Sequence, residues 1–249
     1  MSISLKQAFS FVPNDAKWIT KILIGGLLLF FPTFVYVFPG IKRLVLDPIN
    51  YYMLALFAML VFVSSSAVCG YFFKTVHNRI VHLNGHLPSW KHFTYYIYVG
   101  IKAYLGGLIL AIPFMLIMAV FAFFTPMTIG KELIPIALIA LLLHVFYTIF
   151  YIMLALNFSL DFRINSFFNI KKAYSLIKNN LVNYAVLVCY CLVVAMINFV
   201  ATVILLNAQI FMLLLPFVSF YICLVYTDLF AQFELNLEGE DCREIKCYS

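Results

Sequence analysis

The sequence predicts an all-α protein, a polytopic bundle of six transmembrane helices in a single domain, and two observations lead to this fold class. Hydrophobic residues make up 65% of the 249-residue chain and charged residues only 10%, whereas soluble domains have about 45–50% and about 25%. Several apolar runs also carry few charges over about 18 or more residues, the length that crosses a hydrocarbon core of about 30 Å. This composition excludes a water-soluble globular domain.

Six apolar runs are the predicted spans. We expect them at residues 22–38, 51–73, 99–124, 133–160, 184–206 and 210–233, within one domain of residues 1–233. Pro39-Gly40 ends the first span, and Pro113 with its neighbouring glycines lets the third span bend or pack closely. Residues 207–209 leave room only for a tight hairpin. Residues 234–249 carry five acidic and two basic side chains, and we expect a mobile acidic cytoplasmic tail.

An amphipathic segment precedes each pair of spans, and we expect each to lie in the membrane interface. In the first, residues 2–21, Asn14 or Asp15 can cap a helix that starts at Ala16. The second, Arg79–Tyr98, belongs to an elbow of residues 74–113 that breaks at Asn84-Gly85 and restarts near Pro88. In the third, residues 161–183, apolar side chains recur at helical spacing. The three form a weak parallel repeat, although any six-span chain with cytoplasmic ends can be divided in this way.

The positions of the basic residues predict the orientation of the chain. Thirteen of the sixteen Lys and Arg residues lie in the N-terminal segment, the elbow and its return into the membrane, the third amphipathic segment and the tail. Basic residues near span ends are retained in the cytoplasm. We therefore expect both termini and all three amphipathic segments on the cytoplasmic side.

Six basic side chains are candidates for contact with lipid headgroups, because anionic lipid attracts each nearby Lys or Arg by about 1 kcal/mol. They are Lys74, Arg79, Lys91, Lys171, Lys172 and Lys178. The elbow also holds four of the five histidines, which fit a headgroup surface, a solvated interface or a metal site: His77, His82, His86 and His92. The helix break between His82 and His86 argues against converging metal ligands.

Three polar side chains inside predicted spans are candidates for an intramembrane polar site. They are His144, Asn157 and Asn198. Polar groups at such depth are functional candidates by default. A hydrogen bond to a neighbouring helix explains each of them equally well.

We assign no catalytic, cofactor-binding or metal-ligating residue from the sequence. The ten carboxylates lie in connections, near span ends or in the tail, so we expect no buried charge. The sequence has no HExxH, Gly-x-Ser-x-Gly or P-loop motif. Cys242 and Cys247 could supply two thiolates to a metal, but structural zinc usually takes four ligands, which favours a reduced pair in a loose tail.

Two stretches of the chain carry a family resemblance. The first, residues 14–28, reads NDAKWITKILIGGLL, and the second combines Gly70-Tyr71, Arg79, Asn84-Gly85, Leu87-Pro88-Ser89-Trp90 and Gly100-Ile101-Lys102. With these residues the first half of the chain resembles prokaryotic integral membrane proteins known only as a domain of unknown function. Ser89, Lys91 and His92 replace acidic residues that usually surround the Trp of that pattern. The resemblance implies a multi-pass fold in a prokaryotic plasma membrane and no established activity.

The leading functional hypothesis is a non-catalytic membrane module that binds lipid headgroups or a partner membrane protein, which includes a second copy of itself. Nucleic acid is not an expected partner. The alternative is a small transporter or permease component for an apolar or lipid-like substrate, which the spans broken by Gly and Pro favour. An intramembrane enzyme is the third hypothesis, because oligomeric partners could supply residues.

Overall fold

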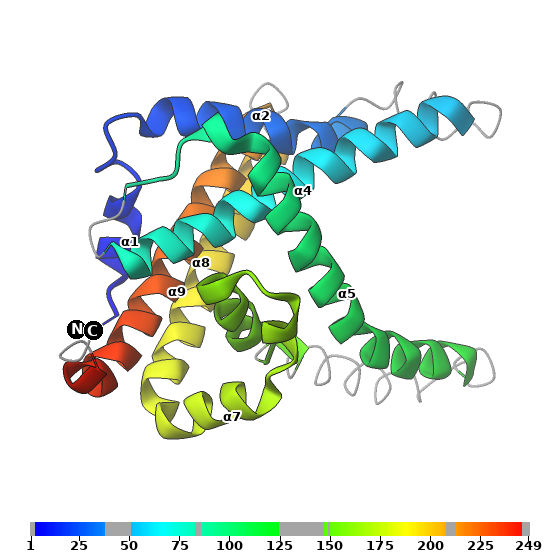
Figure 1. The fold of residues 1–249 in the computed structure, drawn as a ribbon. Helices are drawn as coiled ribbons and strands as arrows, with labels where there is room; N and C mark the ends of the chain where they lie inside the picture. Colours follow the sequence, from blue (N-terminus) through cyan, green and yellow to red (C-terminus); the bar gives the residue numbers. More distant parts are fainter. Residues whose placement is uncertain are drawn as a thin grey trace. The chain divides into compact units, whose positions relative to one another are not determined.

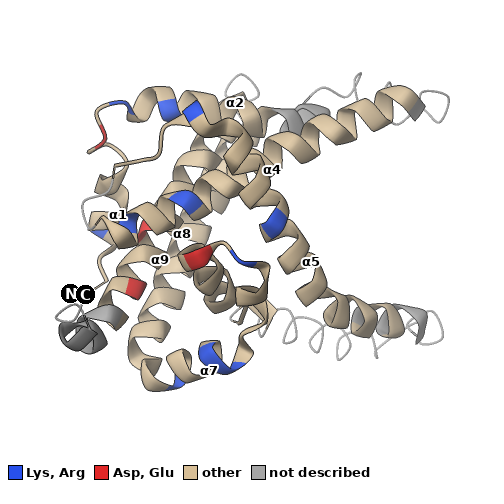
Figure 2. Ribbon diagram, in the orientation of Figure 1, with Lys and Arg blue, Asp and Glu red and all other residues tan. Residues whose placement is uncertain are grey.

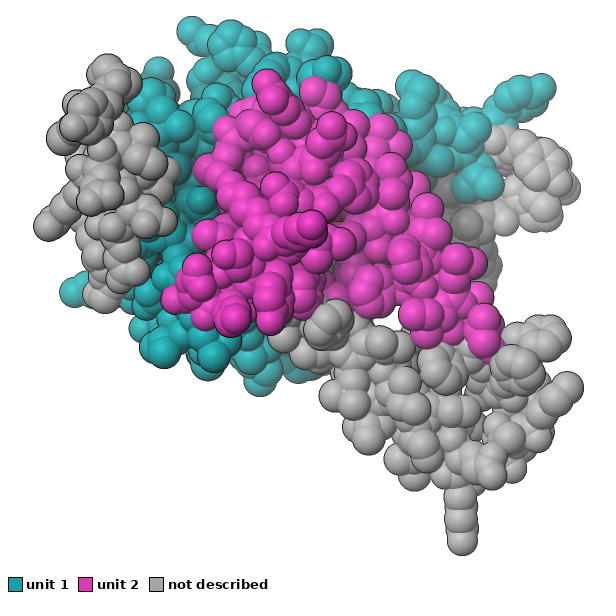
Figure 3. Space-filling model, turned by 60° about the horizontal axis from the view of Figure 1, so that its bottom comes forward, with its two compact units in different colours: residues 1–101, 180–249 teal, residues 102–179 magenta. Residues whose placement is uncertain are grey.

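The computed structural model describes residues 3–37, 51–82, 86–124, 147–148, 150–207 and 213–245 (Figure 1). These residues form helices and short connections, with no β-strand among them, so the all-α prediction is confirmed. The chain divides into two compact units (Figure 3). Unit 1 contains residues 1–101 and 180–249, and unit 2 contains residues 102–179.

The helices occur in the following order along the chain. They are α1 (Leu5–Phe11), α2 (Trp18–Val37), α4 (Tyr51–Val81), a 3-10 turn (Trp90–His92), α5 (Phe93–Phe124), a helix at Phe150–Asp161, a second 3-10 turn (Ile164–Phe168), α7 (Ile170–Asn179), α8 (Leu181–Asn207) and α9 (Leu215–Ile245).

Four of these helices are long and apolar enough to cross a membrane. They are Tyr52–Val81, Trp90–Ile117, Leu181–Asn207 and Leu215–Leu237, and they overlap the predicted second, third, fifth and sixth spans. Two shorter apolar helices, Trp18–Phe30 and Phe150–Asp161, overlap the predicted first and fourth spans. Most of the predicted fourth span lies outside the described residues. The chain therefore has the helices of a membrane protein.

Helix α9 is the centre of unit 1, because α1, α2, α4 and α8 all pack against it. Its apolar face contains the fully buried side chains of Phe220, Leu224, Leu229 and Phe233. The helix continues beyond Phe233, where the sixth span was expected to end and the tail to begin. Glu234, Asn236 and Leu237 are buried, so this part of α9 belongs to the packed unit.

Helices α4 and α5 cross with their backbones in close contact. A Cβ atom at Gly70 would collide with the backbone carbonyl of Tyr96, and one at Gly100 would collide with the carbonyl of Ser66. The two contacts pair residues four apart on each helix in opposite order, so the helices run antiparallel. Small residues at this spacing let membrane helices approach closely.

Unit 2 is organised around Phe167, which is fully buried. Its ring lies 4.7 Å from the ring of Phe158 and 6.2 Å from the ring of Tyr151, and Gly106 of α5 leaves the space that it fills. The helix at Phe150–Asp161 is followed directly by Phe162, which has a positive φ of 54°. The carbonyl of Phe162 accepts a hydrogen bond of 3.5 Å from Lys102 Nζ.

Helix α7 has the predicted amphipathic character. Ala173 is buried, whereas the three lysines predicted to contact headgroups, Lys171, Lys172 and Lys178, are exposed. Ile170 and Tyr174 are also exposed. The helix therefore presents basic and apolar side chains together, which is typical of helices that lie in a membrane interface.

Candidate functional site

Asp15 organises the connection between α1 and α2. Its Oδ1 atom accepts a hydrogen bond from the backbone N–H of Lys17 at 2.9 Å, which closes the turn before α2. The helix starts at Trp18 and not at Ala16, where the sequence placed its capped start. Its Oδ2 atom accepts a 2.8 Å bond from Lys21 Nζ and a 3.0 Å bond from the backbone N–H of Leu87. One buried carboxylate thus joins α2 to the segment that precedes α5.

These contacts also determine the acidity of Asp15. Burial by itself raises the pKa of the carboxyl, because desolvation disfavours the charged form. The hydrogen bonds from Lys21, Lys17 and Leu87 and the charge of Lys21 lower it by more. The pKa of Asp15 is therefore below its ordinary value, and the carboxylate is ionised at neutral pH.

The segment of residues 87–90 is held by side chains at each position. The carbonyl of Leu87 accepts a bond from Lys21 Nζ at 2.5 Å. The next two carbonyls accept bonds from tyrosine hydroxyls, Tyr71 to Pro88 at 2.9 Å and Tyr96 to Ser89 at 2.6 Å. At the fourth position, Trp90 Nε1 donates to the carbonyl of Lys21 at 3.2 Å. This part of the elbow is therefore fixed by internal contacts.

Aromatic packing reinforces the same segment. The rings of Tyr71 and Trp90 are stacked with centroids 4.2 Å apart. Tyr96 meets both rings edge-on, at 5.5 Å and 5.7 Å, and Phe220 of α9 lies 5.8 Å from Tyr71. Such pairs contribute about 0.5–1.5 kcal/mol each beyond the area they bury. The elbow is thus anchored to α4, α5 and α9 within unit 1.

A second polar cluster joins α4, α9 and the N-terminal segment. Arg79 Nε donates to Asp228 Oδ1 at 2.7 Å, and the aspartate is completely buried. Gln232 Nε2 donates to the other carboxylate oxygen at 2.6 Å. The amide of Gln232 also exchanges hydrogen bonds with the backbone of Ser4, at 2.7 Å and 3.2 Å. The expectation of no buried charge is therefore wrong, because Asp228 is buried with a cationic partner.

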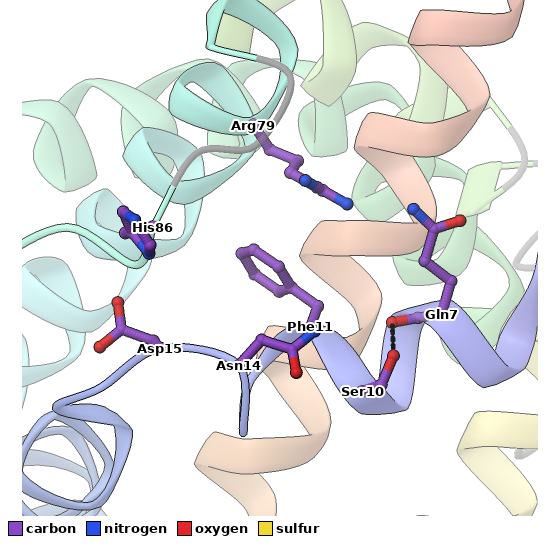
Figure 4. Close-up of a pocket in the computed structure, with 7 residues that line it drawn as sticks. All are labelled: Gln7, Ser10, Phe11, Asn14, Asp15, Arg79 and His86. Carbon is purple, nitrogen blue, oxygen red and sulfur yellow. Dashed lines mark hydrogen bonds between the residues drawn. The ribbon is translucent and has the colours of Figure 1, made fainter.

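A polar pocket of about 290 Å³ lies between the two clusters (Figure 4). Its walls are seven residues from α1, the connection after it, the end of α4 and the elbow: Gln7, Ser10, Phe11, Asn14, Asp15, Arg79 and His86. In Figure 4, Asp15 and His86 lie at one end, Gln7 lies at the other, and Arg79 and Phe11 lie between them. The guanidinium carbon of Arg79 is 5.0 Å from the centre of the Phe11 ring.

The structure distributes the six predicted headgroup residues over both units. In unit 1, Lys91 is exposed, Lys74 is half-buried, and Arg79 is buried beside Asp228. In unit 2, the three lysines of α7 are exposed, and Figure 2 shows basic residues along this helix. Among the elbow histidines, His82, His86 and His92 are exposed and His77 is half-buried. No group of three or more metal-ligating side chains occurs in the described part of the chain.

Two of the three predicted intramembrane polar residues can be located. Asn157 is 5% exposed, and its Nδ2 atom has no hydrogen-bond partner among the described residues. Asn198 is half-buried, and its Oδ1 atom likewise has no partner in the described ranges. They belong to different units. His144 lies outside the described residues.

Sequence reasoning missed Asp228, Gln232 and Ser4. The charge of Asp228 is the feature of the sequence that could have indicated its role. Arg79 and Asp228 each stand near the end of an apolar run, and a charge at such a position calls for a partner of opposite sign. Nothing in the sequence indicates that these two residues, 149 positions apart, are partners.

Apolar helices of membrane-spanning length, packed around α9, define an integral membrane protein of the all-α class. Nine of the residues that carry the family resemblance lie in the contacts described above, seven in or beside the two polar clusters and two at the crossing of α4 and α5: Asp15, Lys21, Tyr71, Arg79, Leu87, Pro88 and Trp90, with Gly70 and Gly100 at the crossing. The chain belongs to DUF4013, a family of proteins of unknown function, whose family model matches residues 53–207. No curated protein and no solved structure matches the chain.

Proposed function

We propose that this protein is a non-catalytic membrane module that binds anionic lipid headgroups through the exposed basic face of α7. The observation that carries the proposal is the composition of this helix. Lys171, Lys172 and Lys178 are exposed beside the exposed apolar side chains of Ile170 and Tyr174. Apolar side chains insert below the headgroups of a bilayer, while lysines interact with its anionic surface.

The proposal includes a topology of six spans. The two shorter apolar helices, Trp18–Phe30 and Phe150–Asp161, supply the first and fourth spans beside the four long ones. Both termini and the three amphipathic segments lie on the cytoplasmic side of a prokaryotic plasma membrane. The distribution of Lys and Arg supports this orientation, because basic loops are retained in the cytoplasm.

The lipid selectivity of the full-length protein tests the proposal. The protein is extracted in mild detergent with an equal mixture of phosphatidylglycerol and phosphatidylcholine, and the retained lipids are measured by mass spectrometry. We expect the wild type to retain the anionic lipid selectively at low salt. Replacing Lys171, Lys172 and Lys178 with Gln removes an attraction on the order of 1 kcal/mol per lysine and abolishes the selectivity.

The matched control replaces the same three lysines with Arg, which keeps the charge at each position. This variant retains selectivity, and about 1 M salt reduces it, because the Debye length falls to about 3 Å. Unchanged selectivity in the Gln variant refutes the role of α7. A partner membrane protein that co-purifies with the wild type but not with the Gln variant would identify a protein as the ligand instead of lipid.

Asn157 favours a second candidate function, transport of an apolar or lipid-like substrate. Buried polar atoms normally have a hydrogen-bond partner, and its Nδ2 atom has none in the described part of the chain. Water in a substrate path would supply one. A cysteine at this position would then react with a charged, membrane-impermeant thiol reagent, whereas no reaction would show that the site is closed to water.

A further inference from the structure

The pocket between the two polar clusters has one buried charge of each sign in its walls. Arg79 is 9% exposed and Asp15 is 5% exposed, and both line the pocket. Each belongs to an ion pair, Arg79 with Asp228 and Asp15 with Lys21. The two pairs are neutral together, so the pocket has separated positive and negative groups without net charge.

Four further polar side chains line the pocket, and the hydroxyl of one of them, Ser10, donates a 3.0 Å hydrogen bond to the carbonyl of Gln7. Gln7, Asn14 and His86 are exposed, and Ser10 is an exposed residue of α1. Amides, a hydroxyl and an imidazole can donate or accept hydrogen bonds according to the ligand. The ring of Phe11 supplies an apolar surface among them, against which methylene groups can pack.

The position and size of the pocket limit what can enter it. Arg79 is two residues from the end of the candidate span Tyr52–Val81, and Asp15 is three residues before the start of α2 at Trp18. The pocket therefore lies where spans leave the apolar core, which is the level of lipid headgroups. A volume of about 290 Å³ is at the lower limit of small-molecule sites, which begin at about 300 Å³. It has room for a headgroup and none for acyl chains.

A ligand with a large net charge would be attracted by one of the two charged groups, Arg79 and Asp15, and repelled by the other. A zwitterion of short length is attracted by both. Guanidinium groups bind phosphate through charge-assisted hydrogen bonds, and a carboxylate accepts hydrogen bonds from a primary ammonium group.

We propose that this pocket binds an aminoalkyl phosphate, as the ethanolamine headgroup of a membrane lipid or as the free ester, with its phosphate toward Arg79 and its ammonium toward Asp15. The proposal rests on the membrane location in the proposed function but not on α7, which belongs to the other unit. The two can therefore fail separately.

Binding of defined probes to the full-length protein in mild detergent tests the proposal. The probes are short-chain phosphatidylethanolamine, phosphatidylglycerol of the same chain length, and phosphoethanolamine. Both lipids are measured on the variant in which Lys171, Lys172 and Lys178 are replaced with Gln, so that α7 does not contribute. We expect phosphatidylethanolamine to bind this variant about tenfold or more tightly than phosphatidylglycerol, since one charge-assisted hydrogen bond accounts for about that factor. Phosphoethanolamine that binds as tightly as the lipid identifies the free ester as the ligand, and weaker binding identifies the lipid.

A blocking substitution links the binding to this pocket. Ser10→Trp places a large side chain in the pocket from an exposed position on α1, and we expect affinity for phosphatidylethanolamine to fall about tenfold or more. Lys6→Trp is the control, because Lys6 is exposed on the same helix and does not line the pocket. Circular-dichroism spectra that match the parent protein show that both variants are folded. Equal affinity for the two lipids, or unchanged binding in Ser10→Trp, overturns the proposal.

Discussion

Replacing Asp228 with Asn tests how strongly the buried ion pair supports unit 1. The substitution keeps the shape of the side chain but removes its charge. Both carboxylate oxygens accept hydrogen bonds, one from Arg79 at 2.7 Å and one from Gln232 at 2.6 Å. The amide nitrogen of Asn must occupy one of these two positions, where it faces another donor. The variant therefore loses a hydrogen bond as well as the charge partner of a buried guanidinium.

The expected cost is about 3–5 kcal/mol, the range observed when one partner of a buried ion pair is removed. The assay is unfolding of the purified protein in mild detergent by added SDS, followed by circular dichroism. The double variant Arg79→Met with Asp228→Leu is the matched control. It removes both charges, and its free energy of unfolding should return close to the wild-type value, because apolar replacement of a whole buried pair is often neutral or stabilising.

Two outcomes would refute this reasoning. A loss below about 1 kcal/mol in Asp228→Asn would mean that the pair contributes no more than an exposed salt bridge. A double variant as unstable as the single variant would mean that the instability comes from lost packing and not from an unpaired charge.

Two further predictions concern the helix crossing and the elbow. Gly70→Ala should lower the free energy of unfolding by about 1–3 kcal/mol, because the added Cβ collides with the backbone of Tyr96. Gly107→Ala is the control, because its Cβ makes only ordinary van der Waals contacts. Equal losses of stability for the two variants in SDS unfolding would contradict the close crossing of α4 and α5. Asp15 has a folded-state pKa below 3.8, so its contribution to stability is present above about pH 4 and is lost as the pH falls through the folded-state value. Asp15→Asn should be less stable than the wild type at pH 6, and its free energy of unfolding should fall less than that of the wild type between pH 6 and pH 3. Equal falls in the two proteins would contradict this linkage.

Several elements could be predicted because their signals are local. The long apolar runs predicted the helices Tyr52–Val81 and Leu181–Asn207 with ends within a few residues, except where α4 continues beyond Phe73 through a polar stretch to Val81. Apolar side chains that recur at helical spacing predicted α7. Each of these signals depends on residues within a few turns of one another.

The structure agrees with the predicted elbow only in part. The restart near Pro88 and the helix that follows Trp90 are present. The sequence indicated a surface segment, but Leu87 and Pro88 are buried and their backbone groups bind Asp15, Lys21 and Tyr71. A polar segment can be internal when its backbone groups all find partners, and the partners here lie 17 to 72 residues away along the chain.

The sequence alone determined the class of this protein. Its apolar composition and the length of its helices require a membrane environment, because no soluble fold buries so much apolar surface. The tertiary structure alone decided which polar residues act together. Ion pairs such as Arg79–Asp228 form between helices that are distant in sequence, and their partners are selected by how α4 and α9 pack. That packing produces no periodic pattern in the sequence, so the pocket between the two clusters can be identified only from the folded protein.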